Sequence, residues 1–173
     1  MPDLRRIATA ERLWAAGALL ILGILVLGID AAASALARRV AGSAGPALVA
    51  ALGNAIVATR FGITLLPGRE PLISRYSRFD SSGLPDQHGG YTRRLTAVWA
   101  ALLGGFALLH AAAAAVAPQA VTALSVVEAL VCIGTFWGEH AVRNRRFPQH
   151  GRATPLRTFR AICLAHRVLR HAA

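Results

Sequence analysis

Four long apolar stretches divide this 173-residue chain, at residues 13–37, 46–66, 95–117 and 120–140. Each stretch is close to the ~20 residues that a helix needs to cross the ~30 Å hydrocarbon core of a bilayer. Charged residues make up only 16% of the chain, against ~25% in soluble domains. The sequence therefore predicts an all-α integral membrane protein. We expect a four-helix bundle within residues 1–148, followed by a basic tail at 149–173.

The basic residues, all of them arginine, are distributed unevenly between the apolar stretches. Sixteen of the 19 would lie on one side of the membrane, only Arg38 and Arg39 on the other, and Arg60 within a span. Because arginines favour cytoplasmic loops, we expect a multi-pass membrane protein with both termini cytoplasmic. The net charge of +11 then reflects orientation and contact with anionic lipid headgroups. The chain has no stacking platform or reader motif for nucleic acid.

The N-terminal stretch has a second interpretation. Arg5 and Arg6, the following apolar run and the triplet Ala35-Leu36-Ala37 resemble a signal peptide with its cleavage site, although the run exceeds the usual ~7–15 residues. Cleavage there would leave three helices and the same orientation for the rest.

The loop at residues 67–94 contains a short amphipathic segment. Leu72, Ile73, Tyr76 and Phe79 recur at helical spacing, which predicts a short interfacial helix lying in the headgroup layer. The alternative is a solvated loop. Residues 81–90 are rich in turn-forming types and would connect this segment to the third span.

Polar side chains inside the spans require an explanation, because ionisable groups are costly in hydrocarbon. Asn54, Arg60, His110 and Glu128 fall within the apolar stretches, and we expect them to form an intramembrane polar cluster. Such a cluster is consistent with a proton relay, a polar ligand site or interhelical hydrogen bonding. Arg60 would either extend to the headgroups or pair with Glu128 or Glu139.

Known catalytic and metal-binding motifs are missing from the sequence. Glu139 and His140 are adjacent, and adjacent helical residues diverge by about 100°, so we do not expect one ligand face. The cysteines, Cys132 and Cys163, have no metal-site spacing. We therefore predict no catalytic residues, metal or cofactor. Gly134 and Gly138 form a GxxxG pattern, which is typical of close helix packing and suits a homo-oligomer.

Three segments resemble a known family. They are Leu-Leu-Pro-Gly-Arg-Glu-Pro-Leu-Ile-Ser-Arg at 65–75, Tyr-Thr-Arg-Arg-Leu-Thr-Ala-Val-Trp at 91–99 and Gly-Glu-His-Ala-Val-Arg-Asn-Arg-Arg-Phe-Pro at 138–148. Together they are similar to small uncharacterised bacterial inner-membrane proteins associated with aryl-polyene (xanthomonadin-like) biosynthesis gene clusters. The resemblance covers roughly the C-terminal 110 residues and implies a role in the assembly of a lipid or pigment.

These observations predict a non-catalytic accessory protein that contacts the lipid bilayer and docks an acidic acyl-carrier protein or peripheral biosynthetic enzymes. Its cytoplasmic interface would contain Arg69, Glu70, Arg75, Arg78, Arg93, Arg94, Glu139, His140, Arg143, Arg145 and Arg146. Two alternatives remain open. One is a small oligomeric transporter or flippase component that uses the intramembrane polar cluster. The other is a membrane-embedded transferase that uses Glu139 and His140.

Overall fold

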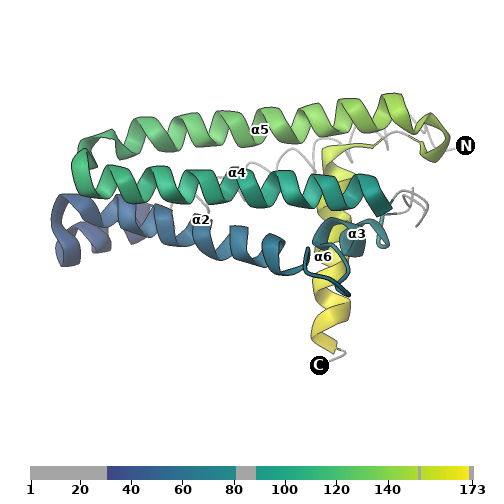
Figure 1. Cartoon of the computed structure of the whole chain (residues 1–173), viewed down its shortest axis with the longest axis horizontal. Helices are drawn as coiled ribbons and strands as arrows, with labels where there is room; N and C mark the ends of the chain where they lie inside the picture. Colours follow the sequence, from purple (N-terminus) through teal and green to yellow (C-terminus); the bar gives the residue numbers. More distant parts are fainter. Residues whose placement is uncertain (1–30, 81–88, 152, 172–173) are drawn as a thin grey trace, which may run out of the picture.

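The computed structural model describes residues 31–80, 89–151 and 153–171, and within these ranges the chain is helical without strands. Three long helices, α2 (Gly45–Ile63), α4 (Gly89–Val116) and α5 (Val121–Arg146), lie side by side (Figure 1). Two shorter helices are α3 (Leu72–Ser77) and α6 (Pro155–His171). Short 3-10 turns, η1 (Gly42–Ala44), η3 (Pro118–Ala120) and η4 (Pro148–His150), complete the described elements.

Three described segments are long and apolar enough to cross a membrane. They are Ala31–Ile63, Gly90–Val116 and Pro118–Arg146. The predicted all-α membrane architecture is therefore confirmed. Most of the first predicted span, at 13–37, lies outside the described residues, so a fourth helix and the cleavage alternative stay predictions. Residues 31–41 are helical.

Both chain reversals at one end of the bundle, here called the turn end, are tight. Gly42 adopts a left-handed φ of 62°, which favours glycine. Gly45 packs so closely on the backbone of Ala37 that a Cβ would overlap its carbonyl. At the other reversal, α4 stops before Pro118, and η1 and η3 contact each other. These reversals hold α2, α4 and α5 in neighbouring positions.

The tightest packing in the bundle is between α2 and α4, whereas α5 contacts α4 less extensively. Gly104 of α4 approaches Ala58 of α2, where a glycine Cβ would lie 3.9 Å from the alanine Cβ. Small residues permit such close approach in membrane helices. By contrast, Leu130 and Trp137 of α5 are each 65% exposed, as expected for side chains that face lipid.

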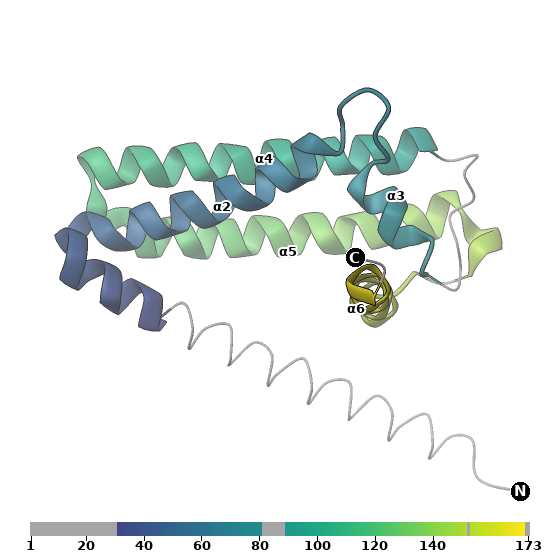
Figure 2. The same cartoon turned by 90° about the horizontal axis from the view of Figure 1, so that it is seen from below.

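Helices α3 and α6 lie near the opposite end of the bundle, here called the arginine-rich end. Figures 1 and 2 show α6 running across the long helices rather than along them. Its Ala161 and Ala165 are 4% and 0% exposed, so small side chains allow close packing on the bundle. The predicted helix at 71–79 is observed as α3, which packs on α4 and α6. Its Ile73 and Tyr76 line a cavity between α3 and the neighbouring helices.

Candidate functional site

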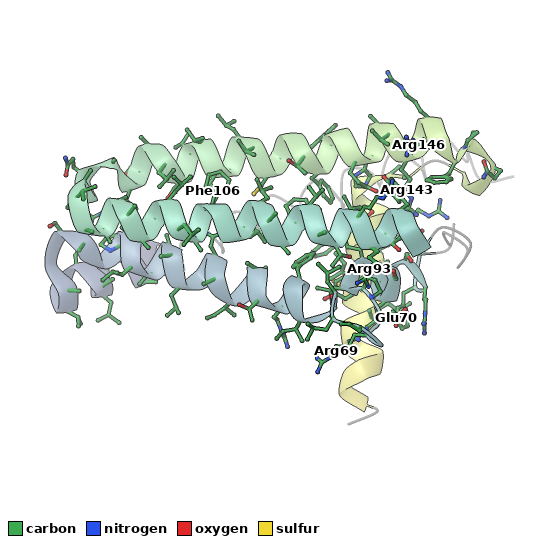
Figure 3. All side chains as sticks on the ribbon, in the orientation of Figure 1. Arg69, Glu70, Arg93, Phe106, Arg143 and Arg146 are labelled. Carbon is green, nitrogen blue, oxygen red and sulfur yellow. The ribbon has the colours of Figure 1, made fainter. Side chains whose placement is uncertain are left out.

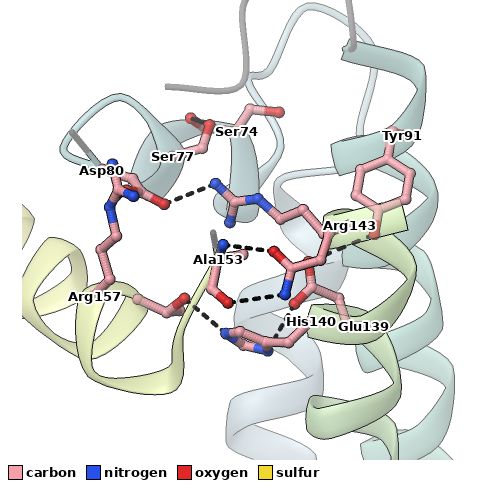
Figure 4. A network of polar contacts seen from close by, with 11 residues as sticks. Ser74, Ser77, Asp80, Tyr91, Glu139, His140, Arg143, Ala153 and Arg157 are labelled. Carbon is pink, nitrogen blue, oxygen red and sulfur yellow. Dashed lines mark hydrogen bonds and ion pairs between the residues drawn. The ribbon is translucent and has the colours of Figure 1, made fainter. Parts of the chain in front are cut away.

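A carboxylate in the turn after α3 connects three elements at the arginine-rich end. Asp80 Oδ2 accepts a hydrogen bond from Arg143 of α5 at 2.7 Å, and Asp80 Oδ1 lies 2.9 Å from Nε of Arg157 on α6. The side chains of Asp80 and Arg143 are only 4% and 9% exposed. Ion pairs removed from water need this close geometry to offset desolvation. We call Asp80, Arg143 and Arg157 the Asp80 cluster (Figure 4).

His140 makes a second connection between α5 and α6. Its Nδ1 donates to the Phe136 carbonyl at 2.7 Å, since a carbonyl only accepts, and its Nε2 lies 3.1 Å from the Thr158 hydroxyl. Glu139 Oε2 is 3.0 Å from the same Nδ1, and Tyr91 of α4 donates to Glu139 Oε1 at 3.5 Å. Although adjacent helical residues diverge by about 100°, the side chains of Glu139 and His140 bend toward one another. Both ring nitrogens of His140 have internal partners, which favours a structural role.

The turn between α5 and α6 is closed by one asparagine. Asn144 accepts a hydrogen bond from the Ala153 amide at 2.6 Å and donates to the Ala153 carbonyl at 3.2 Å. Gly151, with φ 75°, supplies the left-handed backbone that the reversal requires. Together, these interactions bring the arginine-rich α6 back across the bundle.

Hydroxyl groups satisfy the first amides of α3. The Leu72 amide donates to Thr64 Oγ1 at 3.0 Å, and the Ile73 amide donates to Thr96 Oγ1 at 3.4 Å. Thr96 is fully buried. A further hydrogen bond of 2.6 Å joins Ser74 to Thr92. Because unpaired buried amides are costly, these threonines fix α3 against α4.

A cavity of about 320 Å³ lies between α2, α3, α4, α5 and α6 at this end. Its apolar walls are Val57 and Phe61 of α2, Ile73 and Tyr76 of α3, Leu95, Trp99 and Leu103 of α4, Phe136 of α5, and Ala161 and Ile162 of α6. The remaining lining residues are Ser77, Asp80, Glu139, Arg143 and Thr158. The cavity is thus mostly apolar, with polar groups from the Asp80 cluster and its neighbours along part of its wall.

The four predicted intramembrane residues do not form one cluster in the described structure. His110 of α4 and Glu128 of α5 do pair, with Nε2 and Oε2 2.8 Å apart. Asn54 instead donates to the Ala50 carbonyl of its own helix at 3.1 Å. Arg60 is exposed on α2, and Glu128 and Glu139 have other partners. Of the two alternatives for Arg60, the pair with Glu128 or Glu139 is not formed among the described residues.

His110 is the most enclosed of these four side chains. It is completely buried, and its Nδ1 has no hydrogen-bond partner among the described residues. Glu128 retains 20% side-chain exposure. Burying an imidazole with one unpaired nitrogen costs free energy. The contact with Glu128 pairs the other nitrogen, and it therefore helps to set the register of α4 against α5.

The Gly134 and Gly138 pattern faces open space. A Cβ built on either glycine would meet no atom within 4 Å, so the close helix packing expected from GxxxG does not occur within the described chain. The glycines leave a shallow stripe on the surface of α5.

Several of the predicted interface residues have partners within the chain, and some of these are also exposed. Glu70 pairs with Arg78 at 2.7 Å and approaches Arg75 at 3.9 Å. Arg143 is buried in the Asp80 cluster, and Arg93 donates to the Leu65 carbonyl. The exposed arginines at this end are Arg69, Arg78, Arg93, Arg94, Arg145, Arg146 and Arg160. Figure 3 shows Arg69, Arg93, Arg143 and Arg146 at the same end of the molecule.

Sequence analysis missed Asp80, Tyr91, Asn144, Arg157 and Thr158. Asp80 carried a usable signal, since acidic residues are few in this chain: eight against 19 basic. Each acid in the described ranges, namely Glu70, Asp80, Glu128 and Glu139, has a basic or histidine partner. A rare acid among arginines is therefore a candidate for an ion pair, although the sequence does not reveal its partner.

The described ranges contain no group of three or more His, Cys, Asp or Glu side chains that could hold a metal ion. A scan against protein-family models, a search of curated proteins and a search of solved structures gave no match.

Proposed function

We propose that this protein is a non-catalytic accessory protein of a bacterial inner membrane, whose arginine-rich end docks an acidic acyl-carrier protein. The resemblance in residues 65–75, 91–99 and 138–148 points to the assembly of an aryl-polyene lipid or pigment as the pathway. The observation that carries the proposal is the gathering of exposed arginines on a framework fixed by the Asp80 cluster.

The proposed orientation places the arginine-rich end in the cytoplasm, with four spans and both termini inside. In this arrangement Arg38 and Arg39 lie near the turn end, in the helical residues that directly precede η1. A soluble acyl-carrier protein would then reach Arg69, Arg94 and Arg146 from the cytoplasm. Acidic and basic surfaces steer such encounters and set their salt dependence.

Supporting geometry comes from the elements that present the charges. Arg145 and Arg146 end α5, Arg94 lies in the first turns of α4, and Arg160 projects from α6. Asp80, in the turn after α3, links α5 and α6 directly. A preorganised basic surface loses less conformational entropy on binding than arginines on a free tail.

Binding of a purified acyl-carrier protein to the protein in nanodiscs of uncharged lipid tests the docking. The double variant Arg145→Glu with Arg146→Glu reverses two exposed charges and should weaken binding about tenfold or more, an effect of ~1.4 kcal/mol. The matched control is Arg38→Glu with Arg39→Glu, another adjacent exposed pair, which should leave binding unchanged. Equal effects of both variants would reject the proposed surface.

Deletion of the gene in its host, followed by mass analysis of extracted membrane lipids and pigments, tests the pathway. We expect an aryl-polyene ester to disappear or to accumulate in the inner membrane. An unchanged lipid profile would overturn the pathway and leave the docking to be judged by the binding experiment alone.

One observation favours a second candidate, an oligomeric transporter component for a lipid-linked polyene. His110 and Glu128 are paired within the membrane-spanning part, where ionisable groups mark proton and substrate pathways. Homo-oligomers would use the open Gly134 and Gly138 stripe. Glu128→Gln distinguishes the candidates: a docking protein should retain its cellular function, and a proton-coupled carrier should lose it.

A further inference from the structure

We infer that the cavity between α2, α3, α4, α5 and α6 is a binding site for a single-chain amphiphile, one apolar chain ending in an ester or carboxyl group. This goes beyond the proposed docking, because binding of the chain needs no soluble partner. Four features carry the inference: the depth of the cavity, its opening, the polar part of its wall and its size.

The cavity crosses the expected boundary between hydrocarbon and headgroups. Along α4, Leu103 lies about 21 Å from the turn end at Ala117, at ~1.5 Å per residue. Along α5, Arg143 lies about 34 Å from Ala120 by the same rise. With the turn end as one boundary of a ~30 Å core, Leu103, Trp99 and Phe136 fall inside hydrocarbon, whereas Leu95, about 33 Å from Ala117 by the same rise, lies at the headgroup boundary. The Asp80 cluster then falls at headgroup depth.

The opening of the cavity is on the apolar side. Of its lining residues, all within the described ranges, Val57 alone is exposed, at 42%. Val57 lies about 18 Å along α2 from Gly45 at ~1.5 Å per residue, which is well inside the core. A ligand dissolved in the bilayer can therefore insert its chain sideways past Val57, whereas a soluble ligand has no such apolar route.

The polar part of the wall fits the end of such a ligand. Thr158, Tyr76 and Arg143 line this region. The Arg143 guanidinium has five N–H donors, so it can donate to a carbonyl oxygen beside its hydrogen bond to Asp80. Burial of Arg143 favours a compact oxygen acceptor over a bulky headgroup. Asp80 and Glu139 on the same wall disfavour a ligand that carries several negative charges.

Size excludes a full phospholipid. At about 320 Å³ the cavity is at the lower end of the ~300–1,000 Å³ range of small-molecule sites. It is suited to one chain rather than two. Trp99 and Phe136 supply flat aromatic walls, which also suit a rigid conjugated chain.

Photolabelling in nanodiscs of two-chain phosphatidylcholine tests the site. The probe is a long-chain fatty acid with a mid-chain diazirine, used beside its methyl ester, and labelled peptides are mapped by mass spectrometry. We expect labelling to concentrate on peptides that contain Trp99, Phe136 and Ile162. Stronger labelling by the acid than by the ester would assign a carboxyl end group, and the reverse would assign an ester.

Two adjacent variants provide a matched comparison. Val57→Trp places an indole at the opening and should lower cavity labelling about tenfold, corresponding to ~1.4 kcal/mol. Ile56→Trp alters the neighbouring, 55% exposed residue outside the cavity and should leave labelling unchanged. Ala161→Leu fills the opposite wall and should act like Val57→Trp.

Two results would overturn the inference. One is labelling spread over lipid-facing residues such as Leu130 and insensitive to Val57→Trp, which indicates bulk lipid only. The other is equal cavity labelling by a two-chain diazirine phospholipid. If the protein labels with the fatty-acid probe in the cavity but does not bind the acyl-carrier protein, only the docking proposal is rejected.

Discussion

Asp80 and Arg143, 63 residues apart in sequence, form a nearly buried ion pair with Oδ2 and a guanidinium nitrogen 2.7 Å apart. This pair joins the turn after α3 to α5, and Arg157 extends it to α6. The short helix, the crossing helix and the bundle therefore share one carboxylate. That carboxylate therefore contributes to the position of α6, and with it to one wall of the cavity.

Asp80→Asn should destabilise the protein strongly, because it leaves the buried Arg143 without its carboxylate partner. We expect a loss of about 3 kcal/mol, within the ~3–5 kcal/mol range for breaking a buried pair. Unfolding by denaturing detergent would measure the loss, and faster tryptic cleavage within α6 would show its release.

The control for Asp80 is Glu70→Gln. Glu70 pairs with Arg78, whose side chain is 64% exposed, and exposed pairs contribute ~0–1 kcal/mol. Similar stability losses in the two variants would contradict the structural role assigned to the Asp80 cluster.

The contact between His110 and Glu128 should appear as a coupling in a double-mutant cycle. Glu128→Leu removes the partner of a fully buried imidazole, and the His110→Phe change removes the imidazole itself. We expect a coupling of about 0.6–1.7 kcal/mol, the range for interhelical hydrogen bonds in membranes, with the double variant more stable than additivity predicts. Unfolding in mixed micelles measures all four proteins, and strictly additive losses would rule out the contact.

Gly45→Ala should disrupt the reversal at the turn end. An added Cβ overlaps the Ala37 carbonyl, and overpacking of this kind costs ~1–3 kcal/mol. Gly53→Ala is the matched control on the same helix, since a Cβ there meets no atom within 4 Å. The thermal midpoint of each variant in detergent measures the effect, which should be confined to Gly45.

Hydropathy predicted the three described spans, because a chain segment that crosses lipid must make its backbone hydrogen bonds internally and therefore forms a long apolar helix. The segments expected at 46–66, 95–117 and 120–140 correspond to α2, α4 and α5, whose ends differ by several residues. For example, α2 ends at Ile63, and Thr64 to Leu66 continue as single turns with short-range hydrogen bonds. Local periodicity also predicted α3.

The candidate site was harder to predict, because its contacts join distant segments. No sequence spacing predicts the Asp80 cluster or the contact between His140 and Thr158. Depth alone suggested that Asn54 would join His110 and Glu128, but its amide donates to the Ala50 carbonyl of its own helix. Periodicity identifies which residues share a depth, whereas rotation and tertiary packing decide which of them meet.

The two native cysteines report sidedness without added labels. Cys163 is exposed on α6, and Cys132 is partly buried within α5. If the arginine-rich end is cytoplasmic, a membrane-impermeant maleimide should label Cys163 in inside-out vesicles and fail to do so in intact spheroplasts. Cys132 should stay unlabelled in both, since it lies about 18 Å from Ala120 along α5, at ~1.5 Å per residue, and therefore within the core. The Cys163→Ala variant should abolish the signal. Labelling of Cys163 in intact spheroplasts would contradict the proposed orientation, because it would place the docking surface outside the cytoplasm.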